Sequence, residues 1–334
     1  MDLGFGDSQL ELRTAVRDVL AKECPPALVR TCLDDPEAWR PLWKRAVDLG
    51  WTGLALLDDD AGMGVIELIA VLEELGAAAA PIPLLSSAGL AAGALRAVGP
   101  HALRWQEELA EGAVGALAVD TSPGAVDAVR ADVFVVIAGQ ELSVVRPGAG
   151  VDLVPLDAVD PARPMSRLTL GAGVSIEATF PVSIPAALTI PLTAAAAELV
   201  GLASRVLDVA VTHASTREQF DRVIGSFQAI KHRLADCYVA IERARGLTYA
   251  AAMLAADPDA DAVEAWRAAA LAKAAAGDAA TETTRAGVQV LGALGMTWEH
   301  DMHLYLRRAW QMSPVLGDSP TLYRDAASSL VGAR

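Results

Sequence analysis

The sequence has few cysteines, few aromatic residues and a deficit of basic residues. Its three cysteines, Cys24, Cys32 and Cys237, match neither a disulfide framework nor the spacing of a metal site. Acidic residues outnumber basic ones by 42 to 27, and the formal net charge is −15. This balance argues against a nucleic-acid-binding protein, which needs a basic face, and against electrostatic docking on anionic lipid.

The sequence also lacks a long uninterrupted hydrophobic run. Runs such as residues 77–81 and 194–197 are far shorter than the roughly 20 residues of a membrane-spanning helix. Residues 1–7 are acidic and show no basic segment followed by an apolar one, so no ordinary signal peptide is expected. We therefore expect a soluble, reduced, cytoplasmic protein with neither a membrane nor a nucleic acid as partner.

What the chain does contain is alanine-rich helical patterning. Hydrophobic residues make up 53% of the sequence, and much of that share is alanine, the best helix former. The following segments are predicted to be helical: 8–20, 41–49, 66–75, 86–98, 194–214, 226–256, 260–294, 300–315 and 321–330. Ser226 is well placed to cap the helix that begins there.

The helical segments are interrupted by a region of a different character. Between residues 113 and 187, short β-type runs alternate with Gly and Pro, which predicts a small sheet. The order predicts an α+β fold that is mostly α. It consists of an N-terminal helical domain (residues 1–112), a small central β domain (residues 113–187) and a C-terminal four-helix-type bundle (residues 188–334).

The most informative motif comprises residues 216–220 and residues 224–232. An arginine such as Arg217 can hold a pyrophosphate through two hydrogen bonds. Gln228, in the first turn of a predicted helix, adds an amide donor near the positive end of the helix dipole. These residue types suit a large anionic ligand. The alternative is that Arg217 caps a helix end while the aromatic residues of the motif, Phe220 and Phe227, belong to the core.

Together with residues 289–297 and 304–309, this motif resembles the signature of the acyl-CoA dehydrogenase family. Residues 49–55 are similar to the family's turn between early helices and residues 73–76 to its next helix, so the resemblance covers nearly the whole chain. It implies FAD as cofactor and an acyl-CoA as substrate. The resemblance assigns the cofactor contacts to Arg217, Phe220, Gln228, Gln289, Gly292 and Ala293. In the family, such residues reach a flavin held mainly by the neighbouring subunit, which implies an oligomer.

The sequence departs from the family at the catalytic base. The family reaction removes an α-proton from the acyl-CoA while a hydride leaves the β-carbon for the flavin, so a carboxylate must lie beside the α-carbon. In this chain Leu316 stands in the usual base position, within the triplet 315–317. The second position used by some members falls near Pro191. Neither residue can accept a proton.

Two acids close to these positions are weak candidates for a relocated base. Asp318 lies two residues beyond Leu316, where the family usually has a threonine that touches the flavin; its alternative role is that of an N-cap or turn acid. Glu198 follows the second position by about two turns, and its alternative role is on a solvated or ion-paired helix face.

The central β domain is also shorter than in complete family members. Residues 118–124, which resemble the family's flavin-facing loop, lead almost directly to the strand at residues 131–136. The resemblance therefore implies that this domain cannot cradle its own flavin ring. No metal site is expected at His300, Asp301 and His303. The two histidines lie on one helix face, but a third or fourth ligand is not evident.

These departures predict the short, base-lacking subunit of a heteromeric acyl-CoA dehydrogenase. Some bacterial family members, including ones similar to actinobacterial steroid side-chain enzymes, pair such a chain with a longer one, and an α2β2 arrangement is expected. The longer subunit supplies the base, and an electron-transfer flavoprotein accepts the electrons. Two alternatives remain. The chain is a self-sufficient homo-oligomeric enzyme that uses Asp318 or Glu198, or it is a non-catalytic scaffold or regulatory homologue.

Overall fold

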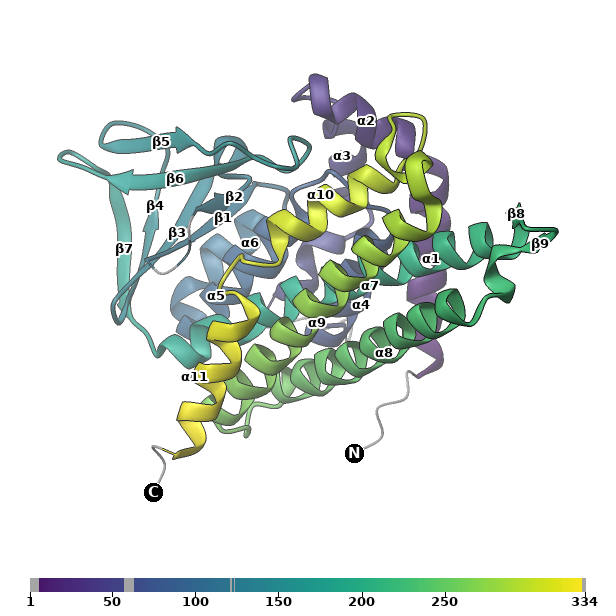
Figure 1. The fold of residues 1–334 in the computed structure, drawn as a ribbon. Coiled ribbons are helices and arrows are strands. Elements are labelled where there is room, and N and C mark those ends of the chain that lie inside the picture. Colours follow the sequence, from purple (N-terminus) through teal and green to yellow (C-terminus); the bar gives the residue numbers. More distant parts are fainter. Residues whose placement is uncertain (1–5, 57–62, 121, 123, 332–334) are drawn as a thin grey trace.

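The computed structural model describes residues 6–56, 63–120, 122 and 124–331. It consists of helices at both ends of the chain and a small sheet region between them, which confirms the predicted mostly helical α+β class (Figure 1). The N-terminal helices are α1 (Asp7–Glu23), α2 (Pro26–Asp34), α3 (Arg40–Asp48), α4 (Val65–Ala77), α5 (Gly93–Leu95) and α6 (Leu103–Ala110). Shorter helical segments are η1 (Trp51–Ala55), the π-helix η2 (Leu85–Ala92) and η3 (Arg96–Ala102).

The strands form two small sheets that pack against each other. One sheet has the order β1 (Gly115–Val119), β3 (Val133–Ala138), β4 (Glu141–Val145), β7 (Ile176–Pro181). The other has the order β2 (Ala125–Val126), β6 (Met165–Leu170), β5 (Val151–Pro155). Strands β1 and β3 are parallel, and all other neighbours are antiparallel. Strands β1 and β3 are buried over most of their length, whereas more and less exposed residues alternate along β7 and the second half of β6.

The C-terminal bundle is built around one long helix. Its helices are α7 (Ile184–Thr216), α8 (Gln228–Ala256), α9 (Ala262–Leu291), α10 (Met302–Met312) and α11 (Ser319–Val331). Helix α7 packs against α4, α8 and α9, and it begins ten residues earlier than the predicted segment at 194. By length and hydropathy α7 is long and apolar enough to cross a membrane, but 94% of its most apolar window is buried inside the fold, as expected of a core helix.

Two glycines allow α4 and α7 to cross in direct backbone contact. A β-carbon on Gly76 would lie 2.0 Å from the Glu198 carbonyl oxygen, and one on Gly201 would lie 1.7 Å from the Glu73 carbonyl oxygen. Any larger residue would therefore force the helices apart. This crossing fixes the N-terminal helices on the bundle.

The predicted cap of α8 is wrong. A 3-10 turn, η5 (Ile224–Ser226), precedes the helix, so α8 begins at Gln228 with Phe227 in extended conformation at its N-cap position. The Ser226 hydroxyl donates to the Val223 carbonyl at 2.7 Å and does not reach an amide of α8. The start of α8 therefore keeps backbone amides that no side chain caps.

Candidate functional site

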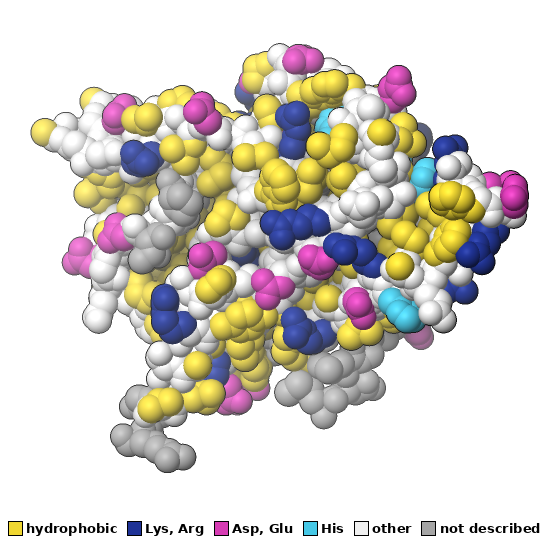
Figure 2. Space-filling model, viewed as in Figure 1, with side chains coloured by type: hydrophobic (Ala, Val, Ile, Leu, Met, Phe, Trp, Pro, Cys, Tyr) yellow, Lys and Arg dark blue, Asp and Glu magenta, His cyan; other side chains and the backbone are white. Residues whose placement is uncertain are grey.

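A short hairpin between α7 and α8 carries the first predicted cofactor residues. Strands β8 (Glu218–Gln219) and β9 (Arg222–Val223) pair around a turn at Phe220 and Asp221, whose φ angles are +55° and +61°. Positive φ at both central residues is the geometry of a tight type I′ hairpin, which is unfavourable for residues with a β-carbon. The hairpin forms one tip of the molecule (Figure 1 and Figure 2), and Phe220 is 86% exposed. The alternative in which Phe220 is a core residue is therefore wrong.

The base of the hairpin and the start of α8 form a surface rich in hydrogen-bond donors. Arg217 directly follows α7 with an exposed side chain, and its backbone N–H donates to the His213 carbonyl at 2.9 Å. Gln228 is exposed at the first position of α8. The Arg222 guanidinium lies 4.0 Å from the centroid of the Phe227 ring. Uncapped helix amides and arginine side chains together favour an anionic group.

The remaining predicted cofactor residues lie at the end of α9. Gln289, Gly292 and Ala293 are exposed, and Gly292 has a φ of +63° that few other residues adopt without strain. Next to them, Val290 is buried in a small hydrophobic cluster that joins α7, α8 and the base of the hairpin. The structure therefore places all six predicted residues at one end of the bundle.

This surface fits one flank of FAD. The cofactor carries a charged pyrophosphate and flat aromatic groups, and the surface presents a guanidinium group, amide side chains, uncapped helix amides and an exposed ring. Because all six residues are exposed, the described part of this chain forms only one side of such a site.

The expected base position is a tight turn between α10 and α11. Leu316 is half-buried there with a φ of +61°, followed by Gly317 at +121°. Asp318 is fully exposed, and its Oδ1 accepts a hydrogen bond from the Thr321 backbone N–H at 3.0 Å, as an N-cap of α11 does. Hydrogen bonding from Thr321 lowers the pKa of Asp318 below its ordinary value, which makes this carboxylate a weaker base.

Glu198 is not on a solvated helix face, as one of its expected roles required. It is 1% exposed in the middle of α7. Its Oε1 accepts hydrogen bonds from Nη2 of Arg163 at 2.7 Å and from Nη1 of Arg308 at 3.3 Å. The ion-paired role is the one that the structure shows. Two buried guanidinium groups thus hold Oε1, and a carboxylate that is 1% exposed is not accessible to a substrate as a general base.

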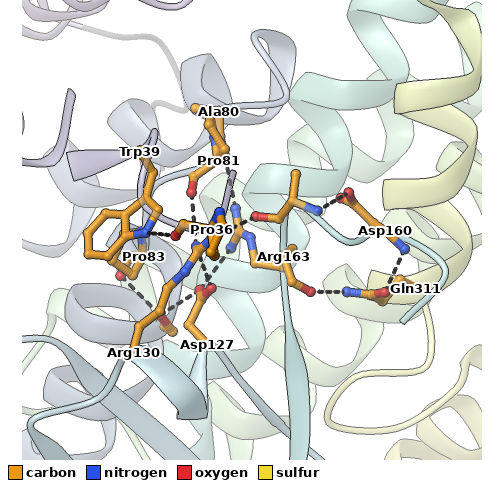
Figure 3. Close-up of polar contacts among 12 residues, drawn as sticks. Pro36, Trp39, Ala80, Pro81, Pro83, Asp127, Arg130, Asp160, Arg163 and Gln311 are labelled. Carbon is orange, nitrogen blue, oxygen red and sulfur yellow. Dashed lines mark hydrogen bonds and ion pairs between the residues drawn. The ribbon is translucent and has the colours of Figure 1, made fainter. Parts of the chain in front are cut away.

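Glu198 belongs to a larger buried cluster at the junction of the three parts of the chain. The cluster's charged members are Asp127, Arg130, Asp160, Arg163, Glu198 and Arg308. Figure 3 shows the side of it that belongs to the β domain, where Arg163 and Asp160 lie beside Gln311 of α10. The Gln311 side chain donates to the Arg163 carbonyl at 2.6 Å and accepts from the Asp160 amide at 2.9 Å.

The cluster also reaches the N-terminal helices. Arg163 and Arg308 each donate to the Ala80 carbonyl at 3.2 Å, and Arg130 donates to the Pro81 carbonyl at 3.0 Å. Sequence reasoning missed this cluster. The one signal for it was the position of single charged residues such as Glu198 inside alanine-rich runs, where a charge needs a partner.

The helices beside this cluster leave no room for a ligand between them. A β-carbon on Gly89 of η2 would lie 2.9 Å from the Ala194 side chain, and one on Gly93 would lie 2.7 Å from the Ile190 side chain. Helix α7 therefore packs directly on η2 and α5. A cavity of about 760 Å³ lies elsewhere, among α1, α4, α7, α8 and α10, and its two buried acids are paired within the chain: Glu73 with Arg13 and Arg245, and Glu74 with Arg13 and Arg17.

The three residues considered for a metal have other contacts. The His300 Nδ1 accepts from the Met302 backbone N–H, Asp301 pairs with Arg30, and the His303 ring packs edge-on against Trp298. Across residues 6–56, 63–120, 122 and 124–331, no group of three or more His, Cys, Asp or Glu residues could hold a metal ion.

The helical, sheet and bundle arrangement, with a donor-rich surface at one end of the bundle, is compatible with a flavoprotein. Models of the acyl-CoA dehydrogenase N-terminal and C-terminal domains match residues 6–113 and 187–330. The chain is 34% identical to acyl-CoA dehydrogenase IpdE2 of Mycolicibacterium smegmatis over 92% of this chain and 93% of that protein. It is also 34% identical to acyl-CoA dehydrogenase FadE34 of Mycobacterium tuberculosis, over 89% of this chain but 43% of that protein.

Solved structures agree with this assignment. A chain of the ChsE4-ChsE5 complex from Mycobacterium tuberculosis superposes with a TM-score of 0.84 at 27% identity over 99% of both chains. A chain of a Tcur3481-Tcur3483 steroid ACAD variant superposes with a TM-score of 0.83 at 25% identity, again over 99% of both chains. The chain belongs to the acyl-CoA dehydrogenase family, whose cofactor is FAD.

Proposed function

We propose that this chain is the subunit without the catalytic base in a heteromeric FAD-dependent acyl-CoA dehydrogenase. Two copies of it and two copies of a longer subunit form an α2β2 assembly that introduces an α,β double bond into an acyl-CoA. An electron-transfer flavoprotein then accepts the electrons. The observation that carries the proposal is that Leu316 and Pro191 stand where the family places its base.

The two nearest acids do not replace that base. Asp318 caps α11 from an exposed position, and Glu198 is held by Arg163 and Arg308 inside the protein. A general base needs an accessible carboxylate within hydrogen-bond reach of the substrate carbon. The burial of Glu198 supports the same conclusion, because its side chain is only 1% exposed.

In this proposal the chain's own residues bind and orient a flavin that is shared with the partner. When bound, FAD accepts the hydride that leaves the β-carbon. Arg217 pairs with the pyrophosphate, the uncapped start of α8 and Gln228 add donors, and the exposed Phe220 ring packs on the cofactor. Gln289, with the backbone at Gly292 and Ala293, contacts the adenine side.

Two of the comparisons support a partner subunit. The ChsE4-ChsE5 and Tcur3481-Tcur3483 structures each contain two named components, and a chain of each covers this chain almost completely. This chain matches only 43% of the length of FadE34, so the unmatched part of FadE34 is longer than this chain. The second complex is a steroid ACAD, which supports a bulky polycyclic acyl group as the substrate class.

The test is purification of the chain alone and together with a longer acyl-CoA dehydrogenase subunit that carries a glutamate base. We expect the chain alone to be colourless and inactive. The complex should show flavin absorption and reduce an artificial electron acceptor with a steroid acyl-CoA. Flavin and turnover in the chain alone would instead support a self-sufficient homo-oligomer, and a colourless, inactive mixture would support a scaffold.

A further inference from the structure

The hairpin between α7 and α8 places a second arginine on the same face as Arg217. Gln219 of β8 lies opposite Arg222 of β9. Two steps further from the turn, the Ile224 N–H donates to the Arg217 carbonyl at 2.8 Å, so these two residues lie opposite each other. Side chains alternate between the two faces along a strand, and opposite residues share a face. Arg217 and Arg222 therefore lie on one face of the hairpin, and Glu218 lies on the other.

The Arg222 guanidinium is held in place by an aromatic ring. It lies 4.0 Å from the centroid of the Phe227 ring, and the Phe220 ring meets the same ring nearly edge-on at a centroid distance of 6.2 Å. Phe227 is half-buried at the N-cap position of α8. A guanidinium over the face of a ring gains a cation–π attraction, and a group that is already oriented loses less freedom when it binds a ligand. Arg222 is therefore oriented before a ligand binds.

The positive charges on this face are not neutralised from within the described structure. Neither Arg217 nor Arg222 forms an ion pair with a carboxylate of the described residues, whereas a buried arginine such as Arg163 does. Of the two acids of the hairpin, Glu218 lies on the other face, and Asp221 at the turn pairs with neither arginine. In a chain whose formal net charge is −15, this face therefore presents two positive charges that remain available to an anion.

A pyrophosphate suits this pair of charges. It carries two ionised phosphate groups, and a guanidinium group binds phosphate oxygens through two parallel hydrogen bonds. Arg217 and Arg222 are diagonal neighbours on adjacent strands, which are roughly 7–8 Å apart, so both long side chains reach a group between them. At the base of the hairpin, Ile224 packs against the cluster that contains Val290 of α9, next to Gln289. The two arginines thus adjoin the residue expected to contact the adenine side.

We propose that Arg222 is a further cofactor-binding residue, which neutralises the FAD pyrophosphate together with Arg217 and is oriented for this by Phe227. This inference rests on the proposed function and adds a residue to the six predicted ones. A single arginine would balance only half of the pyrophosphate charge. The competing role for Arg222 is structural, a contact that only fixes β9 on Phe227, and the two roles differ in how the affinity for FAD responds to salt.

The test measures the affinity of the assembled, deflavinated complex for FAD by flavin fluorescence. Arg222→Gln removes the charge and keeps a polar side chain, and we expect it to weaken FAD binding about tenfold or more. Arg243→Gln, on an exposed face of α8, is the matched control and should change the affinity less than about twofold. The difference between the two variants should shrink from about 50 mM to about 500 mM salt, because salt screens exposed charges.

A second variant tests the role of the ring. Phe227→Leu removes the face on which the Arg222 guanidinium lies and should weaken FAD binding in the unaltered background. In the Arg222→Gln background the same change should have a much smaller effect, because the two substitutions remove one shared contact. Equal effects of Phe227→Leu in both backgrounds would overturn the coupling of Arg222 to Phe227.

The remaining outcomes separate this inference from the proposed function. A loss of FAD affinity in Arg222→Gln that is the same at both salt concentrations, together with a lower urea midpoint, would assign Arg222 the structural role and overturn the inference. Unchanged FAD affinity in Arg222→Gln, in a complex that loses flavin on Arg217→Ala, would overturn the inference and leave the proposed function intact. An unaltered complex that does not bind FAD would overturn both.

Discussion

Replacing Glu198 by glutamine tests the interpretation of the buried cluster most stringently. The cluster balances three arginines, Arg130, Arg163 and Arg308, with three carboxylates, Asp127, Asp160 and Glu198. The Glu198→Gln variant keeps the side-chain shape but removes one negative charge, so the buried cluster becomes net positive. Removing one partner of a buried ion pair costs about 3–5 kcal/mol.

A matched control separates this effect from a general loss of surface charge. Glu282 on α9 pairs with Arg233 at 2.8 Å, but the two side chains are 54% and 43% exposed. Such a pair contributes about 0–1 kcal/mol. We therefore expect Glu198→Gln to lower the free energy of unfolding by several kcal/mol more than Glu282→Gln, measured by urea denaturation of the purified chain.

The same variant distinguishes a structural carboxylate from a catalytic one. In the assembled complex, at a temperature at which the variant is folded, Glu198→Gln should retain flavin and turnover. Equal stability of the Glu198→Gln and Glu282→Gln variants would refute the structural account. Loss of turnover with full flavin occupancy and unchanged stability would show that Glu198 is the base.

Three further predictions concern the flavin surface, the turn at the base position and a buried lysine. Arg217→Ala should lower the flavin content of the purified complex, measured by absorbance, whereas Arg243→Ala on an exposed face of α8 should not. Asp318→Asn should leave turnover almost unchanged, and a large loss at full flavin occupancy would contradict the half-subunit proposal. Burial lowers the pKa of Lys273 from 10.5 to about 7, so the unfolded chain binds more protons than the folded one between these values and stability should rise with pH across that window. Lys273→Met should reduce this rise, as urea midpoints at pH 7 and pH 9 would show.

The fold class could be predicted because its signals are local. Alanine-rich helical segments and short β-type runs separated by Gly and Pro correspond to the helices and strands of the structure. The Arg217 to Gln228 motif likewise predicted a donor-rich surface, because arginine residues and the start of a helix can be recognised from the local sequence. The sequence does not predict the position of Phe220 at a hairpin tip with positive φ, because phenylalanine rarely adopts that conformation.

Two features were missed, one set by local turn geometry and one by contacts distant in sequence. Ser226 has a good capping side chain, but the 3-10 turn before α8 directs its hydroxyl to Val223. The identity of Glu198 allowed either a solvated or an ion-paired helix face, and its partners, Arg163 and Arg308, could not be named because they come from the β domain and from α10. Residues 58–62, whose Asp and Gly content favours a turn, lie outside the described residues.

The central claim is that the base for this reaction comes from the partner subunit. The most direct measurement is turnover of the complex in which the longer subunit's glutamate base is replaced by glutamine and this chain is unaltered. The account predicts full flavin content and loss of turnover by several orders of magnitude, because no carboxylate of this chain takes over the proton abstraction. Turnover close to that of the unaltered complex would contradict the account and place the base in this chain.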